Sequence, residues 1–361
     1  MRAAVMRSKK LVVDEIPVPQ PGPGEALVKT LACGICGSDL HALKHAEKLV
    51  EAAQRSGGPF VMDLKRDIVM GHEFCAEVVD YGPQTTRRIK PGARVCAMPV
   101  LIRPTGVDTV GYSNEHPGGY GEYMRLTEKL LLEVPNGLAT ERAALTEPLA
   151  VGYHAVAKAR LEPDDAPLVI GCGPVGLAVI ASLKFKRVHP IVAADFSPRR
   201  RELALKMGAD VVIDPKEKSP YASWSELAVY ADPARAPVLP PWMPGPPRRP
   251  AVIFECVGVP GVIDSIMAAA PAHARVVVVG VCMERDHIEP MFGINKELNL
   301  QFVLGYTGEE FGATLRHLAE GAIDAEPLVT GKVGVEGVAQ AFEDLASPER
   351  HAKILVEPWR S

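Results

Sequence analysis

A glycine-rich turn between an apolar strand and a helix constrains the fold of this chain more than any other sequence feature. Leu168-Val169-Ile170 predicts a buried strand, which runs into the G-x-G-x-x-G pattern of Gly171-Cys172-Gly173-Pro174-Val175-Gly176 and a helix expected over 175–186. In such a turn the first glycine permits a sharp bend, the second lets a pyrophosphate approach the backbone, and the third allows helix and strand to pack closely. The helix N-terminus presents free N–H groups to the phosphates. The pattern predicts a dinucleotide site that includes Gly171, Gly173, Pro174, Val175 and Gly176.

An acidic residue and three arginines follow the turn. Asp195 ends the next expected strand, where a carboxylate accepts hydrogen bonds from an adenosine ribose. Because a carboxylate repels a 2′-phosphate, this position favours NAD and makes NADP the less favoured cofactor. Arg199-Arg200-Arg201 could attract that phosphate, or could simply open an exposed helix. We expect Asp195 and Arg200 to contact the cofactor.

The pattern of the chain changes near residue 149. After this point, runs of β-branched residues alternate with helical stretches, which predicts a parallel sheet in an α/β domain. We expect strands at 168–170, 191–194, 211–213, 252–254 and 276–279 and a helix over 198–207. Before this point, short β-rich runs broken by Pro and Gly predict an antiparallel, barrel-type domain. This part should also hold a short helix over 45–54 and a loop over 100–121.

Composition and charge narrow the classes of function. The 361 residues fit about two domains, and the net charge of −4 supplies no basic field for nucleic acid. The uncharged run 166–183 contains the glycine-rich turn, so we expect no membrane span. An N-terminus without an apolar signal region and seven scattered cysteines predict a cytoplasmic protein with reduced thiols. Residues 233–250 contain eight prolines, which predicts an extended surface excursion or, less favourably, a ligand for a partner.

Three separated clusters carry candidate metal ligands. The first runs from Cys33 to His41 and includes Cys36, the second is Gly71-His72-Glu73, and the third is Glu147-Pro148. A catalytic zinc takes about three protein ligands and keeps one position open. The separations between these clusters are long and match no compact zinc signature. From the residues alone, a zinc site and ordinary structural roles are equally supported.

In this order, the three clusters and the glycine-rich turn resemble the zinc-dependent alcohol dehydrogenases of the medium-chain dehydrogenase/reductase superfamily, within it the sorbitol, threonine and butanediol dehydrogenase branch. The resemblance covers essentially the whole chain. It implies an α/β fold with a Rossmann doubly wound parallel sheet and a GroES-like β-barrel-type catalytic domain. The expected domains are 1–148 (catalytic), 149–302 (Rossmann) and 303–361 (return to the catalytic domain). The implied reaction moves a hydride between NAD and a secondary alcohol, diol or polyol, in a homodimer or homotetramer.

The resemblance also implies roles for single residues. Cys36 and His72 would bind zinc, Glu73 would be a direct or exchanging ligand, and Glu147 stands where relatives carry the third ligand. Which glutamate binds in the resting state stays open. Asp39 would accept a hydrogen bond from His72 and orient it. Ser38 would contact the alcohol oxygen, and His41 would carry the proton outward through the cofactor ribose.

Two departures from the family pattern carry expectations of their own. Many relatives hold a structural zinc with four closely spaced cysteines, but residues 92–121 contain only Cys96, so we expect one zinc per chain. The long separation of Cys36 from His72 comes from residues 45–65, which resemble butanediol dehydrogenases and would either shape the substrate pocket or form a solvated surface helix.

Two alternative functions remain open. One is a zinc-free quinone or enoyl reductase of the same superfamily, and the other is a nucleotide-binding protein without catalysis.

Overall fold

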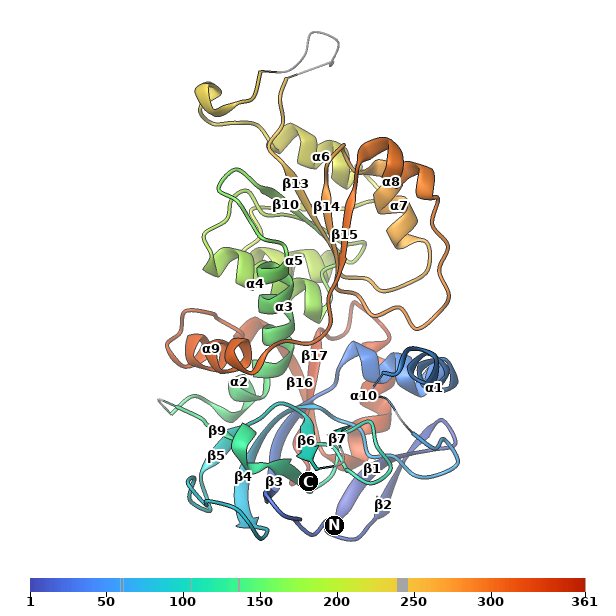
Figure 1. Ribbon diagram of the computed structural model, residues 1–361, viewed down its shortest axis with the longest axis vertical. Coiled ribbons are helices and arrows are strands. Elements are labelled where there is room, and N and C mark those ends of the chain that lie inside the picture. The colour runs from blue at the N-terminus through green and yellow to red at the C-terminus, as the bar shows by residue number, and fades with distance from the viewer. Residues whose placement is uncertain (59, 61, 105, 136, 239–245, 361) are drawn as a thin grey trace. The chain divides into compact units, whose positions relative to one another are not determined.

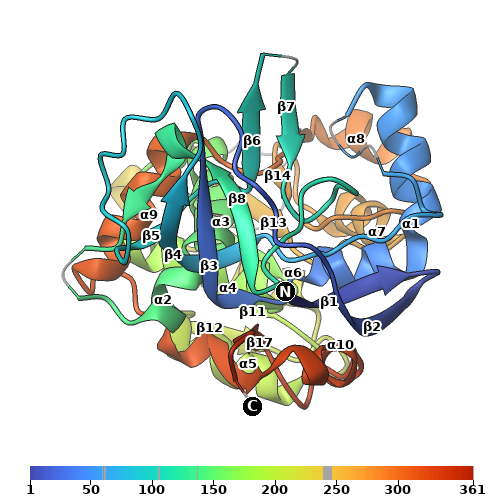
Figure 2. The same ribbon diagram turned by 90° about the horizontal axis from the view of Figure 1, so that it is seen from below.

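The computed structural model (Figures 1 and 2) describes residues 1–58, 60, 62–104, 106–135, 137–238 and 246–360. Within it the chain divides into two units. Unit 1 comprises Met1–Ala150 and Thr307–Ser361, and unit 2 comprises Val151–Tyr306. Among the described residues, no helix has both the length and the apolar character needed to cross a membrane.

Unit 2 is built on a parallel sheet of six strands in the order β12-β11-β10-β13-β14-β15. Every neighbouring pair in it is parallel. The order starts at the centre, runs outward one way and then outward the other way, which is the doubly wound Rossmann arrangement. The strands are β10 (Ala166–Ile170), β11 (Val192–Ala194), β12 (Val211–Ile213), β13 (Ala251–Glu255), β14 (Arg275–Val278) and β15 (Asn299–Phe302). The expected parallel sheet is therefore confirmed, with strand bounds that differ by at most two residues, and β15 is a further strand that was not expected.

Helices connect these strands, as parallel pairing requires. In Figure 1, α4 and α5 lie on one side of the strands and α7 and α8 on the other. The helices are α3 (Thr146–Lys158, which starts in unit 1), α4 (Pro174–Phe185), α5 (Pro198–Met207), α6 (Pro220–Leu227), α7 (Val262–Ala269), α8 (Pro290–Lys296) and the 3-10 turn η2 (Pro233–Arg235). The expected helix over 198–207 is confirmed. Its N-cap Ser197 accepts from the Arg200 amide, and Gly208 ends it in a positive-φ conformation.

A buried apolar cluster holds the sheet of unit 2 together. Leu168, Val192, Ile253 and Val276 come from four neighbouring strands and are at most 1% exposed. Trp224 packs against them from α6, and its indole N–H donates to the Ala166 carbonyl at 2.8 Å. The central strands are thus covered on their faces, which explains why they are continuous runs of apolar residues in the sequence.

Unit 1 contains a mainly antiparallel sheet in the order β16-β17-β3-β4-β5-β9, with β8 paired to β3. Figure 2 shows β3, β4, β5 and β8 side by side. The strands of unit 1 are β1 (Arg2–Arg7), β2 (Lys10–Glu15), β3 (Glu25–Gly34), β4 (Glu73–Tyr81), β5 (Arg94–Cys96), β6 (Val100–Arg103), β7 (Gly106–Thr109), β8 (Tyr123–Thr127), β9 (Leu132–Glu133), β16 (Val329–Val333) and β17 (Lys353–Val356). The C-terminal strand β17 pairs with β3, Leu355 facing Gly34. The end of the chain therefore lies beside the segment that leads to Cys36.

Two expectations for unit 1 were wrong in their bounds. The helix expected over 45–54 is α1 (Gly37–Ser56), which starts just after Cys36 and bends at His45. Its first turn is capped by Asp39, which accepts from the Cys36 amide, and this signal is hidden because Cys is an unusual N-cap residue. The expected loop over 100–121 contains the hairpin of β6 and β7, in whose strands only Leu101 is buried and apolar and polar positions show no clear alternation. The remaining helical segments of unit 1 are α2 (Thr140–Ala144), α9 (Gly308–Ala319), α10 (Val338–Leu345), η1 (Glu128–Leu130), η3 (Glu326–Leu328) and η4 (Val335–Gly337).

The proline-rich stretch 233–250 is described only at its two ends, since residues 239–245 lie outside the described part of the chain. On one side Val238 is 99% exposed, as a surface excursion predicts. On the other side Arg249 donates to the backbone carbonyls of Asp164, Asp165 and His189.

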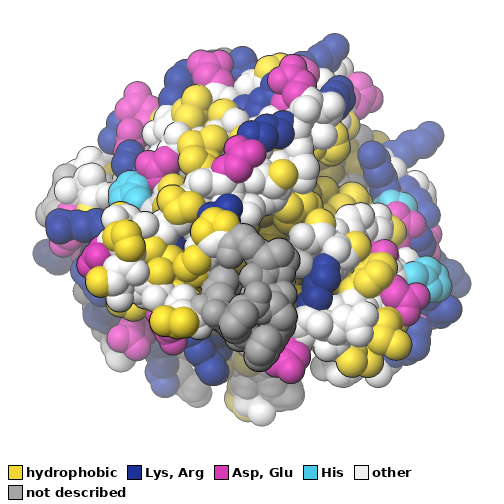
Figure 3. All heavy atoms as spheres, turned by 90° about the horizontal axis from the view of Figure 1, so that it is seen from above, with side chains coloured by type: hydrophobic (Ala, Val, Ile, Leu, Met, Phe, Trp, Pro, Cys, Tyr) yellow, Lys and Arg dark blue, Asp and Glu magenta, His cyan; other side chains and the backbone are white. Residues whose placement is uncertain are grey.

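On the face shown in Figure 3, basic and acidic side chains are interspersed, as the near-neutral composition leads one to expect.

Candidate active site

The register of two antiparallel strands brings three of the candidate ligands together. β3 and β4 pair with Gly34 opposite Glu73, so the chain leaving β3 reaches Cys36 beside the start of β4. Ligand atoms of Cys36, His72 and Glu73 all lie within 4.8 Å of one another. Glu73 is fully buried, His72 is 9% exposed and Cys36 is partly buried. A thiolate, an imidazole and a carboxylate this close form a ligand set for zinc.

Two glycines allow this close approach. A Cβ at Gly34 would collide with the Glu73 carboxylate, and a Cβ at Gly71 would lie 2.8 Å from the Tyr120 ring. Gly71 also has φ +102°, a conformation that residues with a side chain rarely adopt. The glycines in Gly34-Ile35-Cys36 and Gly71-His72-Glu73 therefore have a steric reason to flank the ligands.

Asp39 is the centre of a buried hydrogen-bond network behind the ligands. It is fully buried and accepts from the Cys36 amide at 3.1 Å, the Tyr112 hydroxyl at 2.7 Å and the Tyr120 hydroxyl at 2.6 Å. Burial disfavours the charged carboxylate, but the positive charge of His72 and the donated hydrogen bonds outweigh it, so the pKa of Asp39 is lowered. Asp39 is thus an anion held among donors.

The surroundings of His72 favour a positive charge. Burial alone would lower the pKa of His72, yet Asp39 and Cys36 outweigh burial and raise that pKa well above its ordinary value. Among the described residues, His72 Nδ1 has no partner at ordinary hydrogen-bond length, since Asp39 Oδ1 lies 3.4 Å away. A site that stabilises an imidazolium also stabilises a metal cation, and the residues present fit zinc, with Asp39 behind His72 as an orienting carboxylate.

Lys353 forms a buried ion pair with one of the candidate ligands. Its Nζ lies 2.7 Å from both carboxylate oxygens of Glu73 and 3.0 Å from the Ile35 carbonyl. Burial alone would lower the pKa of Lys353, but the Glu73 charge outweighs it and raises that pKa. Glu73 therefore shares its charge between the ligand cluster and Lys353.

The fourth candidate ligand is placed differently. Glu147 lies in the first turn of α3 and is 9% exposed. Its carboxylate is not in the group formed by Cys36, His72 and Glu73, although its charge contributes to raising the pKa of Lys353. The structure thus brings three of the four expected ligands together and leaves Glu147 near Lys353.

Ser38 and His41 lie on the first turns of α1. Ser38 Oγ is 3.0 Å from the Tyr112 hydroxyl, and His41 is partly buried. Tyr112 also stacks near His72, with ring centroids 5.4 Å apart. The first turns of α1 therefore carry the Ser38 hydroxyl, the Asp39 carboxylate and the His41 imidazole, directly after Cys36 in the chain.

Sequence reasoning missed three residues of this site, namely Tyr112, Tyr120 and Lys353. A lysine that opens the otherwise apolar strand Lys353-Ile354-Leu355-Val356 was a usable signal, because a buried lysine needs a partner. Tyr112 and Tyr120 are at most 6% exposed, and a buried tyrosine hydroxyl also needs a partner. No local pattern names those partners.

The glycine-rich turn of unit 2 has the geometry that its motif predicts. Gly171 has φ +92°, and a Cβ there would lie 2.7 Å from Val257. A Cβ on Gly176 would collide with the Gly171 carbonyl oxygen. Gly173 has only Arg200 atoms near its missing side chain, at 3.9 Å and beyond, so the backbone stays open to a ligand.

Hydrogen bonds from the backbone hold the Asp195 carboxylate beside this turn. It accepts from the Cys172 amide and from the Ser197 amide, each at 2.8 Å. Arg200 Nη1 lies 3.9 Å from Asp195, and its buried Nε has no partner among the described residues. Arg201 pairs with Asp214 at 2.9 Å and donates to the backbone carbonyl of Asp195 at 2.8 Å. Arg200 lies beside Gly173 of the turn and has a guanidinium N–H left to donate among the described residues.

Comparison with known protein families shows to which family this chain belongs. Residues 22–136 match the alcohol dehydrogenase GroES-like domain, and residues 174–320 match the zinc-binding dehydrogenase family. The chain belongs to the zinc-dependent alcohol dehydrogenases of the medium-chain dehydrogenase/reductase superfamily. It is therefore an oxidoreductase of alcohols, with a GroES-like part and a Rossmann part, as its sequence motifs predict.

Relatives of this dehydrogenase act on diols and polyols by name. It is 29% identical to (R,R)-butanediol dehydrogenase of Bacillus subtilis, over 99% of this chain and 100% of that protein. It is 28% identical to sorbitol dehydrogenase of Bos taurus, over 92% of this chain and 89% of that protein. The crystal structure of the Bacillus subtilis butanediol dehydrogenase superposes with a TM-score of 0.79 over 99% of both chains. A zinc-binding dehydrogenase of Sinorhizobium meliloti bound to NADP has the same fold, at 24% identity, 99% coverage of both chains and a TM-score of 0.77.

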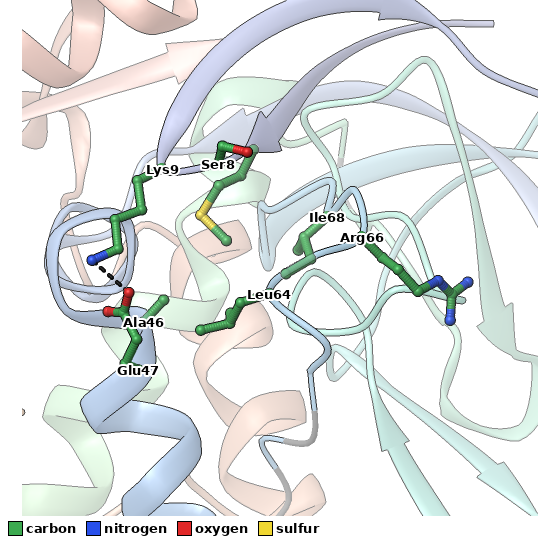
Figure 4. Close-up of a pocket in the computed structure, with 8 residues that line it drawn as sticks. Ser8, Lys9, Ala46, Glu47, Leu64, Arg66 and Ile68 are labelled. Atoms are coloured by element: carbon green, nitrogen blue, oxygen red, sulfur yellow. Dashed lines mark ion pairs between the residues drawn. The ribbon is translucent and has the colours of Figure 1, made fainter.

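The additional segment 45–65 of this dehydrogenase reaches the site through one aromatic residue. Phe60 contacts Tyr112 edge to face, with centroids 5.4 Å apart. Residues 59 and 61 lie outside the described part of the chain. Other residues of the segment border a separate pocket, shown in Figure 4, in which Lys9 and Glu47 form an ion pair at 2.5 Å. That pocket is lined by Met6, Ser8, Lys9, Ala46, Glu47, Leu64, Arg66 and Ile68.

Proposed function

We propose that this dehydrogenase oxidises a secondary alcohol, diol or polyol with NAD, using one zinc held by Cys36, His72 and a glutamate. The observation that carries the proposal is the convergence of Cys36, His72 and Glu73 at the start of α1, next to Ser38. Zinc held there would supply Lewis acidity that lowers the pKa of an alcohol hydroxyl, and a bound nicotinamide would supply the hydride acceptor.

The protein's own residues position and move the proton. Ser38 accepts a hydrogen bond from the alcohol hydroxyl, and His41, one turn further along α1, is the imidazole that carries the proton outward. Asp39 holds the His72 ring in place from behind. Lys353 is ion-paired with Glu73, and the charge of Glu147, the other ligand candidate, also acts on this lysine.

We infer NAD as the cofactor from the position of Asp195. Its carboxylate is fixed by two backbone amides beside the glycine-rich turn, where it would accept from a ribose and repel a 2′-phosphate. Arg200 is the residue that could offset this repulsion, and a fold neighbour binds NADP. We nevertheless favour NAD. The Asp195 carboxylate is held at 2.8 Å by two backbone amides, whereas Arg200 lies 3.9 Å from it.

We also propose assembly as a homodimer or homotetramer through the edge of the parallel sheet. β15 ends the strand order of unit 2, and Phe302 and Leu304 at its C-terminal end are 63% and 73% exposed. An edge strand with exposed apolar side chains is a template for pairing with a second copy. The seven free cysteines support a reducing, cytoplasmic setting for this assembly.

The test of the proposed function is NAD reduction across a panel of secondary alcohols, diols and polyols, with and without a zinc chelator. We expect NADH formation on a diol or polyol and its loss on chelation. Turnover that is indifferent to chelation, in protein without zinc, would instead favour a zinc-free reductase. NADH binding without turnover of any alcohol would favour a protein that has lost catalysis.

A further inference from the structure

Ser38 has a hydrogen-bond contact that the proposed reaction does not use. Its Oγ lies 3.0 Å from the hydroxyl of Tyr112, which is 6% exposed. The same Tyr112 hydroxyl lies 2.7 Å from Asp39 Oδ1. Tyr112 therefore bridges the proposed substrate-contacting hydroxyl and the carboxylate behind the metal ligands.

The direction of these hydrogen bonds follows from counting protons. Asp39 already receives the Cys36 amide and the Tyr120 hydroxyl, so it serves as an acceptor on all sides. Tyr112 must then donate its single proton to Asp39. The Tyr112 oxygen can only accept from Ser38, and Ser38 is left with lone pairs for any other partner.

Tyr112 is held rigidly enough to impose this direction. Its ring packs between Phe60 and His72, each with a centroid separation of 5.4 Å. Its backbone carbonyl accepts from the Thr109 hydroxyl at 3.0 Å. A serine hydroxyl ordinarily rotates to suit its partners, but here a fixed acceptor selects one rotamer.

We propose that Tyr112 is a positioning residue that keeps Ser38 as a hydrogen-bond acceptor and so makes the site prefer an alcohol over the corresponding ketone. This rests on the proposed function, since it takes Ser38 as the residue that contacts the substrate oxygen. An alcohol donates its hydroxyl proton to the free lone pairs of Ser38. A ketone has no proton to donate, and its oxygen would face those lone pairs without a hydrogen bond.

The test compares binding of 2-butanol and of butanone, its ketone, to the wild type and to Tyr112→Phe. Calorimetry with 2-butanol on the NADH complex and butanone on the NAD complex measures both affinities without turnover. Phenylalanine keeps the ring packing and releases the Ser38 hydroxyl, which can then donate to a ketone. We expect the preference for 2-butanol over butanone to fall about fivefold or more.

Tyr120→Phe is the matched control. It also removes a hydroxyl donated to Asp39, but Tyr120 makes its bond to the other carboxylate oxygen, at 2.6 Å, and its hydroxyl donates to Asp39 alone in this network. We expect the preference for 2-butanol over butanone to stay at the wild-type value in Tyr120→Phe. In a Ser38→Ala background, Tyr112→Phe should no longer change it. Zinc content measured in each variant shows whether the metal site is retained.

The outcomes separate this inference from the proposed function. An equal change of the preference in Tyr112→Phe and Tyr120→Phe would mean that the effect passes through Asp39. An unchanged preference in Tyr112→Phe would mean that Tyr112 has no effect on it. Either result overturns this inference and leaves the proposed function standing. If the wild type binds neither probe and oxidises no alcohol, the proposed function fails. The inferred Ser38–Tyr112 bond is then decided by thermal unfolding, where additive Tm losses of Ser38→Ala and Tyr112→Phe overturn it and non-additive losses support it.

Discussion

Lys353 Nζ lies 2.7 Å from both carboxylate oxygens of Glu73, and the two side chains are 1% and 0% exposed. The pair joins the C-terminal strand β17 to the first residue of β4. It therefore ties the returning end of the chain to the ligand cluster, and its loss should affect both the stability of unit 1 and the behaviour of Glu73.

The first prediction concerns this ion pair. Lys353→Met leaves the Glu73 charge buried and unpaired, which should cost about 3–5 kcal/mol of unfolding free energy. Lys332→Met is the control, because Lys332 also pairs with a glutamate, Glu141, but is 33% exposed, and a surface pair contributes below about 1 kcal/mol. Denaturant unfolding of both variants measures the difference. Similar losses in the two would contradict the structural role given to Lys353.

The second prediction concerns the metal. We expect about one zinc per chain by elemental analysis, and Cys36→Ala should lose the zinc and turnover while still binding NADH, because the nucleotide turn lies in unit 2. Cys96→Ala is the control, since Cys96 donates to the Ala143 carbonyl and should leave the zinc content unchanged. Two zinc ions per chain in the wild type would refute the expectation of a single site.

The third prediction concerns pH and zinc affinity. The raised pKa of His72 means that a proton stays on the imidazole of the zinc-free protein to a higher pH than usual. Zinc must displace this proton, so its affinity should rise as the pH rises toward that pKa and level off above it. Competition with a fluorescent chelator, from mildly acidic to mildly alkaline pH, measures the trend. An affinity that falls over this range would rule out His72 as a ligand.

The raised pKa of His72 also makes the stability of the zinc-free protein depend on pH. A histidine whose folded-state pKa is raised contributes stability that is fully present below its unfolded pKa and is lost as the pH rises through its folded pKa. The zinc-free protein should therefore lose Tm on alkalisation through this window, whereas the zinc-loaded protein should not show that loss.

The fourth prediction concerns the cofactor. Asp195→Ser removes the acceptor for the ribose and should raise KM for NAD by about tenfold or more. KM for NADP should fall, because the repelling carboxylate is gone and Arg200 stays in place. Glu202→Gln is the control, since it breaks the exposed pair with Lys206 on α5 without touching the turn or Asp195. KM values for NAD and NADP in both variants test this. A wild type that prefers NADP would overturn the assignment.

The fifth prediction concerns assembly. Charge placed on the exposed end of β15, as in the double variant Phe302→Lys and Leu304→Lys, should dissociate the oligomer by repulsion across the pairing edge. Val238→Lys is the control, because Val238 is 99% exposed elsewhere in unit 2. Light scattering after size-exclusion chromatography measures the mass of each. An unchanged mass in the double variant would place the interface elsewhere.

Sequence reasoning succeeded best where the signal is local. The strand, turn and helix around Gly171 and the acid at Asp195 follow one another within one βαβ unit, and each follows from its neighbours in the chain. It failed at the start of α1, because the helix begins inside a polar run whose capping pattern uses Cys36 and Asp39 rather than an apolar repeat. It also missed the β6–β7 hairpin, whose short strands carry little hydrophobic pattern.

The sequence by itself determined the parallel sheet, the dinucleotide turn, the candidate ligands and the family, since these depend on residue type and on spacing along the chain. Only the tertiary structure decided that Lys353 pairs with Glu73, 280 residues away, and that Tyr112 meets Ser38 across 74 residues. The same holds for the grouping of Glu73, rather than Glu147, with Cys36 and His72. The physical reason is that strand register and burial select these partners, and a buried charge or hydroxyl pairs with whichever group the fold brings within hydrogen-bond distance.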